Sequence, residues 1–171
     1  QILIGMLLWH TRSVRADLSG YVNYLATRIH IWTANEDKLL NHLIGHLKFS
    51  ADKSLVWQLP AGEKLDVFAL KDANLQSPRS HCSYVVTLGN TSNQCYALLD
   101  WANKKAPIVC TASANSELCA AHYMSANVLG LTSFLADSID SSPFEKEHEG
   151  SVFNFCGDNL ASLLIIQKGH S

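Results

Sequence analysis

The chain has 171 residues, of which 47% are hydrophobic and 16% are charged. This composition is typical of a globular protein and excludes an intrinsically disordered one. The formal net charge of −2 at pH 7 lacks the basic excess of most nucleic-acid-binding domains, so any such contact must come from a local basic patch or from bound metal ions.

Five cysteines are present, and no two of them form a CxxC pair. This pattern argues against a disulfide framework and against a zinc site of known spacing, and it indicates a reducing compartment. The longest apolar run, residues 2–9, is far shorter than the roughly 20 residues that span a membrane and has no basic leader. We expect it to be a buried segment cut from a longer chain, in a protein that is not secreted and has no membrane partner.

Two amphipathic helices are predicted in the first third of the chain. In residues 16–32, apolar side chains recur at helical spacing. Residues 35–47 repeat the same period and begin with Asn35, Glu36 and Asp37. Acidic side chains in a first turn complement the positive end of the helix dipole, so this segment has a clear helical start.

From residue 51 onward the pattern changes to short strands and turns. Strands are predicted at residues 54–59, 65–71, 82–88, 94–101 and 108–111. The turn-rich residues 89–93 connect the third of these strands to the fourth, which indicates a hairpin.

The last third of the chain is predicted to alternate helices and a strand. A long helix is expected at residues 113–136, a polar and acidic loop at 137–150, a strand at 151–156 and a helix at 159–167. Hairpin strands followed by this order of elements predict an α/β or α+β fold, in which helices cover a mixed sheet.

Three acidic residues lie at the ends of the expected elements. Asp72 ends the strand at residues 65–71, Glu117 lies in the first turn of the long helix, and Asp158 follows the strand at 151–156. Converging carboxylates repel one another, so they need a cation to stay ionised together. Oxygen ligands of this kind suit Mg²⁺ or Mn²⁺. Their spacing alone leaves open whether the three meet, because the chain has 15 acidic residues.

Residues 101–120 read WANKKAPIVCTASANSELCA. They resemble the ribonuclease H segment of copia-type retrotransposons, which typically reads W-S-S-K-K-Q-x-x-V-A-x-S-S-T-E-A-E-Y-x-A. The match needs no gap and places Glu117 on a metal-binding Glu. The segment LKDANL is similar to Y-S-D-A-D-W, which places Asp72 on the first catalytic Asp. The segment FCGDNLAS is similar to Y-C-D-N-Q-S-A, which places Asp158 on the last Asp, with Gly157 as a local change.

The N-terminal third resembles the end of the reverse transcriptase of the same polyproteins. GMLLW, then TR and DLSGYVNYLATR, are similar to G-S-L-L-Y and T-R-P-D-I-x-x-A-V-N-Y-L-S-R. The resemblance implies a helical remnant of the reverse transcriptase at residues 1–50. It also implies a C-terminally truncated ribonuclease H-like domain at residues 51–171, with a mixed β-sheet flanked by helices. The implied location is cytoplasmic, in a virus-like particle, or nuclear.

The activity that the resemblance implies is metal-dependent endonucleolytic hydrolysis of the RNA strand of an RNA/DNA hybrid. Asp72, Glu117 and Asp158 would hold two Mg²⁺ or Mn²⁺ ions, and a metal-bound water would be the nucleophile. The implied partners are the hybrid and the reverse transcriptase portion of the same polyprotein. Candidate contacts to the hybrid, for several of which a local role in a turn or loop stays open, are Asn74, Arg79, Ser80, Lys104, Lys105, Ser113 and Asn159.

Several departures from the family pattern bear on activity. Asn74 stands where the family often has a second Asp, and Asn115 replaces the first Glu of T-E-A-E. The chain stops at His170 and Ser171, before the position of a fourth metal-site carboxylate. The rival interpretation is therefore a catalytically decayed or domesticated scaffold or interaction module. A third, an integrase-type nuclease of the same fold, is disfavoured by the reverse-transcriptase-like N-terminus.

Overall fold

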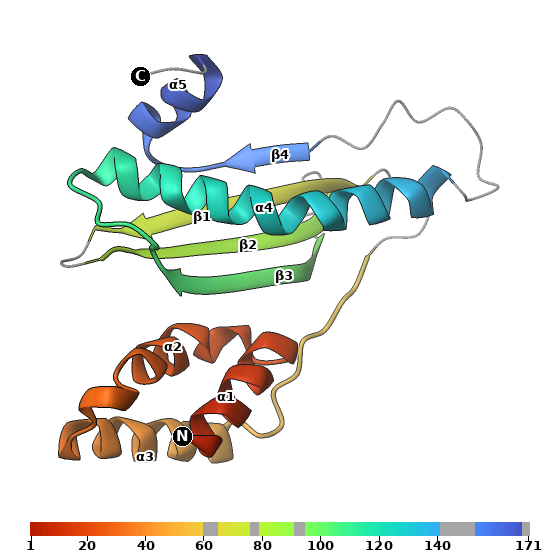
Figure 1. Cartoon of the computed structure of the whole chain (residues 1–171). Helices are drawn as coiled ribbons and strands as arrows, with labels where there is room; N and C mark the ends of the chain where they lie inside the picture. Colours follow the sequence, from red (N-terminus) through yellow and green to blue (C-terminus); the bar gives the residue numbers. More distant parts are fainter. Residues whose placement is uncertain (60–64, 76–78, 91–94, 141–152, 169–171) are drawn as a thin grey trace. The chain divides into compact units, whose positions relative to one another are not determined.

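The computed structural model describes residues 1–59, 65–75, 79–90, 95–140 and 153–168 (Figure 1). The chain forms two compact units, Gln1–Val56 and Trp57–Ser171. None of the helices in the described residues is both long enough and apolar enough to span a membrane.

The first unit is helical, as the apolar periodicity predicts. Its helices are α1 (Ile2–Ser13), α2 (Ser19–Thr27) and α3 (Ala34–Phe49), with short 3-10 turns at Ala16–Leu18 and Ile29–Ile31. The buried side chains that form its core are Ile4, Leu7, Leu18, Val22, Leu25 and Leu43. The two helices predicted at residues 16–32 and 35–47 are confirmed, although 3-10 turns flank the first.

The apolar run at residues 2–9 corrects one expectation. It forms most of α1, and Ile4 and Leu7 are buried on one side of this helix. Ile2, Met6 and Trp9 are 83%, 64% and 72% exposed. The expectation of a buried segment is therefore wrong for five of its eight residues, which are exposed, because a helix turns its successive residues to different sides.

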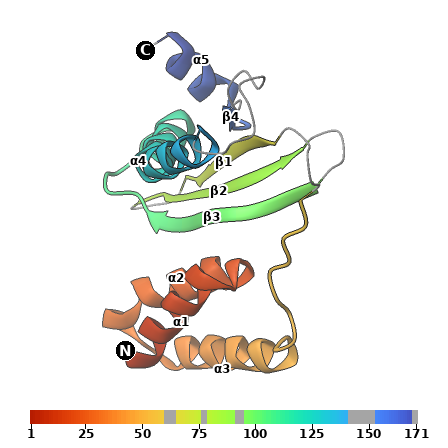
Figure 2. The ribbon, with the colours of Figure 1, turned by 90° about the vertical axis from the view of Figure 1, so that its right-hand side faces the viewer.

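The second unit contains a four-stranded mixed sheet. Its strands are β1 (Asp66–Asn74), β2 (His81–Asn90), β3 (Cys95–Lys105) and β4 (Phe153–Cys156), in the order β3-β2-β1-β4 (Figures 1 and 2). β2 is antiparallel to both of its neighbours, β1 and β3, and β4 joins the sheet parallel to β1. The expected mixed sheet with flanking helices is thus observed.

Helix α4 (Ser113–Asp140) lies along one face of this sheet, and α5 (Leu160–Lys168) follows β4 on the same side (Figure 2). Side chains of β1 and β2 that point to this face pack against α4, and the buried members of this core are Val67, Ala69, Tyr84, Val86, Met124 and Val128. Strand side chains alternate between faces, so Val67 and Ala69, two residues apart on β1, both point into this core.

Two predicted strands do not form. Residues 53–59 have no regular structure, and Val56 and Trp57 are 76% and 62% exposed. Apolar residues alone do not make a strand, because an extended segment needs a neighbouring strand for its backbone hydrogen bonds. Residues 106–112 form bends between β3 and α4, where Pro107 removes a backbone donor.

The other predicted elements form with shifted ends. β1 and β3 run to Asn74 and Lys105, three and four residues beyond their predicted ends, and α4 continues to Asp140. β4 begins at Phe153 and α5 covers Leu160–Lys168, close to the predictions. Most of the turn expected at residues 89–93, the loop at 141–150 and the last residues 169–171 lie outside the described residues.

Candidate metal centre

The three acidic residues singled out in the sequence meet at one end of the sheet. Asp72, Glu117 and Asp158 each offer a carboxylate oxygen, and these oxygens all lie within 4.8 Å of one another. Asp72 and Asp158 are exposed to solvent, whereas Glu117 is only 3% exposed. The convergence that spacing alone left open is therefore present, at a distance compatible with a shared divalent ion.

The parallel pairing of β1 with β4 explains why two of the acids lie side by side. The last pair of this ladder is Leu70 with Cys156. Asp72 and Asp158 each follow this pair by two residues, and parallel strands place equivalent positions next to each other. Glu117 reaches the same place from the first turns of α4. The triad thus depends on one strand register and on one helix start.

A cleft of about 430 Å³ lies beside the two exposed acids. Its lining residues come from β1, β2 and the end of β4 and are Leu70, Lys71, Asp72, Ser83, Tyr84, Val85, Cys156, Gly157 and Asp158. A larger hollow of about 540 Å³ lies in the first unit, where Tyr21, Tyr24 and Leu39 are among its lining residues. Asp17 is the only charged residue of that lining. The smaller cleft, in contrast, is lined by two acidic residues of the triad, Asp72 and Asp158, so it is the better candidate for a functional site.

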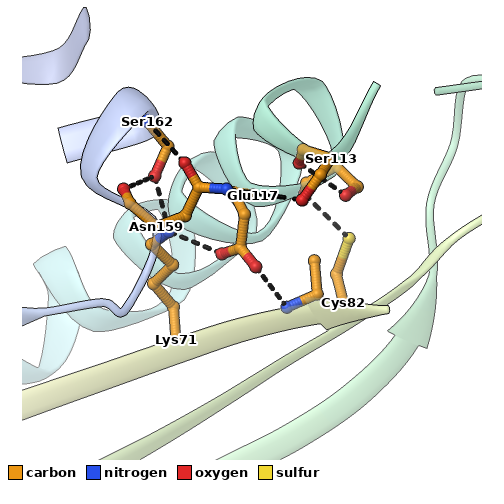
Figure 3. A network of polar contacts seen from close by, with 8 residues as sticks. Lys71, Cys82, Ser113, Glu117, Asn159 and Ser162 are labelled. Atoms are coloured by element: carbon orange, nitrogen blue, oxygen red, sulfur yellow. Dashed lines mark hydrogen bonds and ion pairs between the residues drawn. The ribbon is translucent and has the colours of Figure 1, made fainter. Parts of the chain in front are cut away.

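A buried lysine holds the third acid of the triad. The side chain of Lys71 is 0% exposed, and its Nζ lies 2.6 Å from Oε2 of Glu117 (Figure 3). The same ammonium group donates to Oγ of Ser162 on α5 at 3.0 Å. The other oxygen of Glu117 accepts from the backbone N–H of Ala73 at 3.2 Å. Both oxygens of this carboxylate therefore already have partners.

The sequence analysis missed Lys71, although the strand pattern contains a signal for it. Val67, Ala69 and Lys71 alternate on the face of β1 that packs under α4, and all three are buried. Lysines are almost never fully buried unless they are paired. A lysine in the apolar register of a strand therefore predicts a buried anionic partner, here Glu117.

Gly157 leaves the space that the lysine fills. A Cβ atom at this position would lie 2.6 Å from Cε of Lys71 and 3.0 Å from its Nζ. Real Cβ atoms essentially never approach another atom so closely, so any larger residue here would displace the end of the lysine side chain. Gly157 and Lys71 therefore pack directly against each other, and each precedes an acidic residue of the triad, Asp158 and Asp72.

Two of the candidate contact residues bind each other. Nδ2 of Asn159 donates to Oγ of Ser113 at 3.3 Å, and its Oδ1 accepts from the backbone N–H of Ser162 at 2.9 Å (Figure 3). Oγ of Ser162 donates to the carbonyl of Asn159 at 2.9 Å. These bonds start α5 and connect it to the first turn of α4, so they position the backbone that follows Asp158.

The remaining candidates divide by location. Asn74, His81 and Lys105 are register partners across β1, β2 and β3, at the end of the sheet where β1 carries Asp72. Lys104, the neighbour of Lys105, is exposed, and its Nζ lies 5.3 Å from the centroid of the Tyr123 ring. Both lysines lie within β3, so they do not form the solvated turn that was the alternative for them.

The two candidates before β2 differ in their accessibility. Arg79 is exposed, whereas Ser80 is 0% exposed. The carbonyl of Ser80 accepts from the backbone N–H of Ala106 at 2.7 Å. A buried hydroxyl cannot reach a nucleic acid at the surface, so Ser80 does not qualify as a contact residue. Arg79 is accessible and stays a candidate.

Comparisons with models of protein families, with curated proteins and with solved structures gave no match. The fold and the site themselves define a class. The second unit is a mixed α/β domain with an acidic cluster, partly neutralised by a buried lysine, at the end of its sheet.

Proposed function

We propose that the second unit is a ribonuclease H-like domain that hydrolyses the RNA strand of RNA/DNA hybrids in a metal-dependent reaction. The observation that carries this proposal is the convergence of Asp72, Glu117 and Asp158 within 4.8 Å, because these are the positions on which the family resemblance places the metal-binding acids. The proposal includes a place in a retrotransposon polyprotein beside its reverse transcriptase, in the cytoplasm or the nucleus.

The chemistry of the donor set fits a hard divalent cation. The three acids offer carboxylate oxygens, which Mg²⁺ and Mn²⁺ prefer over softer ligands. Such an ion, when bound, supplies a Lewis acid and a water of lowered pKa for attack on a phosphodiester. Asp72 and Asp158 would hold it from the exposed side of the cluster, and hydrolysis would leave a 3′-hydroxyl and a 5′-phosphate.

The residues around the triad supply a surface for the hybrid. Asn74 and Lys105 belong to the row of register partners at that end of the sheet, and Lys104 and Arg79 are exposed. Cationic side chains contact phosphates, and amides hydrogen-bond the 2′-hydroxyls that distinguish RNA from DNA. Recognition would therefore depend on the shape and sugars of the hybrid and not on its base sequence.

A second candidate function is a folded scaffold or interaction module without turnover. The specific observation in its favour is the ion pair of Lys71 with Glu117 at 2.6 Å, since the ammonium group neutralises the buried acid without any metal. The net charge of −2 also favours this candidate, because it provides little attraction for a polyanion.

A cleavage assay on the full chain separates the two functions. The substrate is a labelled RNA/DNA hybrid, incubated with Mg²⁺ or Mn²⁺ beside the variant Asp72→Asn. We expect cutting of the RNA strand by the wild type and at least about a hundredfold slower cutting by the variant, since a metal-binding acid is lost. Asp52→Asn, the same change at an exposed residue of the first unit, should leave the rate unchanged. Cutting that survives Asp72→Asn or a chelator would contradict metal-dependent hydrolysis at this site. Absence of cutting by the wild type would support the second candidate function, a folded scaffold without turnover.

A further inference from the structure

We propose that Lys71 is a built-in cation of the acidic cluster, which takes the place of a second divalent ion, so that the site binds one metal ion and not two. The inference rests on the metal site of the proposed function and specifies it further. Three separate features of the described residues support it, namely the contacts of the lysine, the charge of the cluster and the packing that holds the lysine in place.

The first feature is the contact itself. Nζ of Lys71 lies 2.6 Å from Oε2 of Glu117 and 3.0 Å from Oγ of Ser162. A cation already sits against the buried acid, and two further protein groups complete the surroundings of this ion pair: the Ser162 hydroxyl and the N–H of Ala73, which donates to Glu117 at 3.2 Å. A divalent ion bound to Oε2 would therefore have to displace the ammonium group or lie directly against it.

The second feature is the charge of the cluster. Three carboxylates carry −3 and the lysine carries +1, which leaves −2. One divalent ion neutralises this remainder. Two ions beside the lysine would bring +5 against −3 into a partly buried site, and like charges at such short range repel strongly. The cluster is therefore matched to a single ion.

The third feature is the packing that keeps the lysine in place. Its side chain is 0% exposed and lies against Gly157, where even a Cβ atom would come within 2.6 Å of Cε. The side chain cannot swing toward solvent without leaving both Glu117 and Ser162. The two acids that remain for an ion, Asp72 and Asp158, are exposed, and the cleft of about 430 Å³ includes both of them.

Counting bound manganese ions tests the inference without an activity measurement. The full wild-type chain is titrated with Mn²⁺, and the free ion is followed by electron paramagnetic resonance. We expect one bound ion for the wild type. The variant Lys71→Met replaces the ammonium group by an apolar chain of similar length, and it should bind a second ion or bind the first about tenfold more tightly, because a repelling charge is gone.

Two controls keep the outcomes distinct. Lys53→Met removes a lysine from the exposed, irregular segment of the first unit and should bind as the wild type does. Asp72→Asn should abolish binding. Two ions on the wild type would overturn the inference while the proposed metal site stands, and so would a Lys71→Met variant that matches the wild type in number and affinity. The wild-type count decides even if Lys71→Met does not fold. Absence of binding to a folded wild type and to a folded Lys71→Met would instead overturn the proposed metal site itself.

Discussion

At the scale of single residues, Lys71 and Glu117 form a buried ion pair in the second unit. Their side chains are 0% and 4% exposed, and the charged atoms lie 2.6 Å apart. Removing water from two charges is costly, so a buried pair is weak evidence for stability by itself. Removing only one partner is strongly destabilising, because the remaining charge stays buried without an opposite charge beside it.

This asymmetry predicts the behaviour of the variants in a chelator. Lys71→Met should lower the free energy of unfolding by about 3–5 kcal/mol, since Glu117 is left as an uncompensated buried charge. The double variant Lys71→Met/Glu117→Gln should be more stable than the single variant, because both charges are gone. Urea unfolding followed by circular dichroism measures the difference. A loss below about 1 kcal/mol for the single variant would mean that the pair behaves like a surface ion pair.

At the scale of an element, the start of α3 shows how a local motif orders a helix. Thr33 and Glu36 form a capping box, in which each side chain bonds to the backbone of the other residue. Glu36 also accepts from Nε of Arg28 at 2.5 Å and contacts Oγ1 of Thr33. The acidic first turn seen in the sequence is thus part of a larger cluster that includes the preceding 3-10 turn region.

The same cluster predicts how stability depends on pH. The hydrogen bonds from Thr33 and then Arg28 lower the pKa of Glu36 from 4.5 to about 2, against the opposing effect of burial. Because the pKa in the folded state is the lower one, this contribution to stability is complete above about pH 4.5 and is lost as the pH falls from 4.5 toward 2. The circular dichroism signal of the helices, recorded against pH at a fixed urea concentration, measures this loss of stability.

The variant Glu36→Gln isolates that contribution. It has no charge to lose, so the part of the acid transition that falls between about pH 4.5 and 2 should shrink relative to the wild type. Asp52→Asn, at an exposed residue, serves as the control for removal of one carboxylate. An acid transition of unchanged size in Glu36→Gln would show that other carboxylates account for it.

At the scale of the whole molecule, the chain consists of two compact units that meet in sequence between Val56 and Trp57. Each has a core of its own, one of helices and one of a sheet with a helix. Residues 53–59 between them have no regular structure. Segments with these properties are typical of boundaries between domains.

This organisation predicts where a protease cuts first among the described residues. Trp57 is 62% exposed and lies in a segment without regular backbone hydrogen bonding, so chymotrypsin should cleave after it before it cleaves within α2 or β1–β3. Mass spectrometry of a brief digest identifies the cut. The variant Trp57→Ser should slow it. Earlier cleavage within α2 or β1–β3 would contradict this view of the two units.

How much of the fold could be predicted depended on the range of the interactions involved. The helices at residues 16–32 and 35–47 were predicted because helix hydrogen bonds and apolar stripes repeat within a few residues. The strand at residues 54–59 was predicted wrongly from its apolar composition, since whether an extended segment joins a sheet depends on a partner far along the chain.

The acids of the candidate site were found in the sequence by their motifs, but their meeting was decided by tertiary structure. Asp72 and Asp158 are neighbours only because β1 and β4 pair in parallel with Leu70 opposite Cys156. The alternation of β1 signals that Lys71 needs a buried anionic partner, but it does not identify that partner, because Glu117 lies 46 residues away in the chain. The sequence by itself determined which side chains bear charge and which segments are helical. Only the packed sheet decided which charges share a site, because electrostatic interactions depend on distance in space and not along the chain.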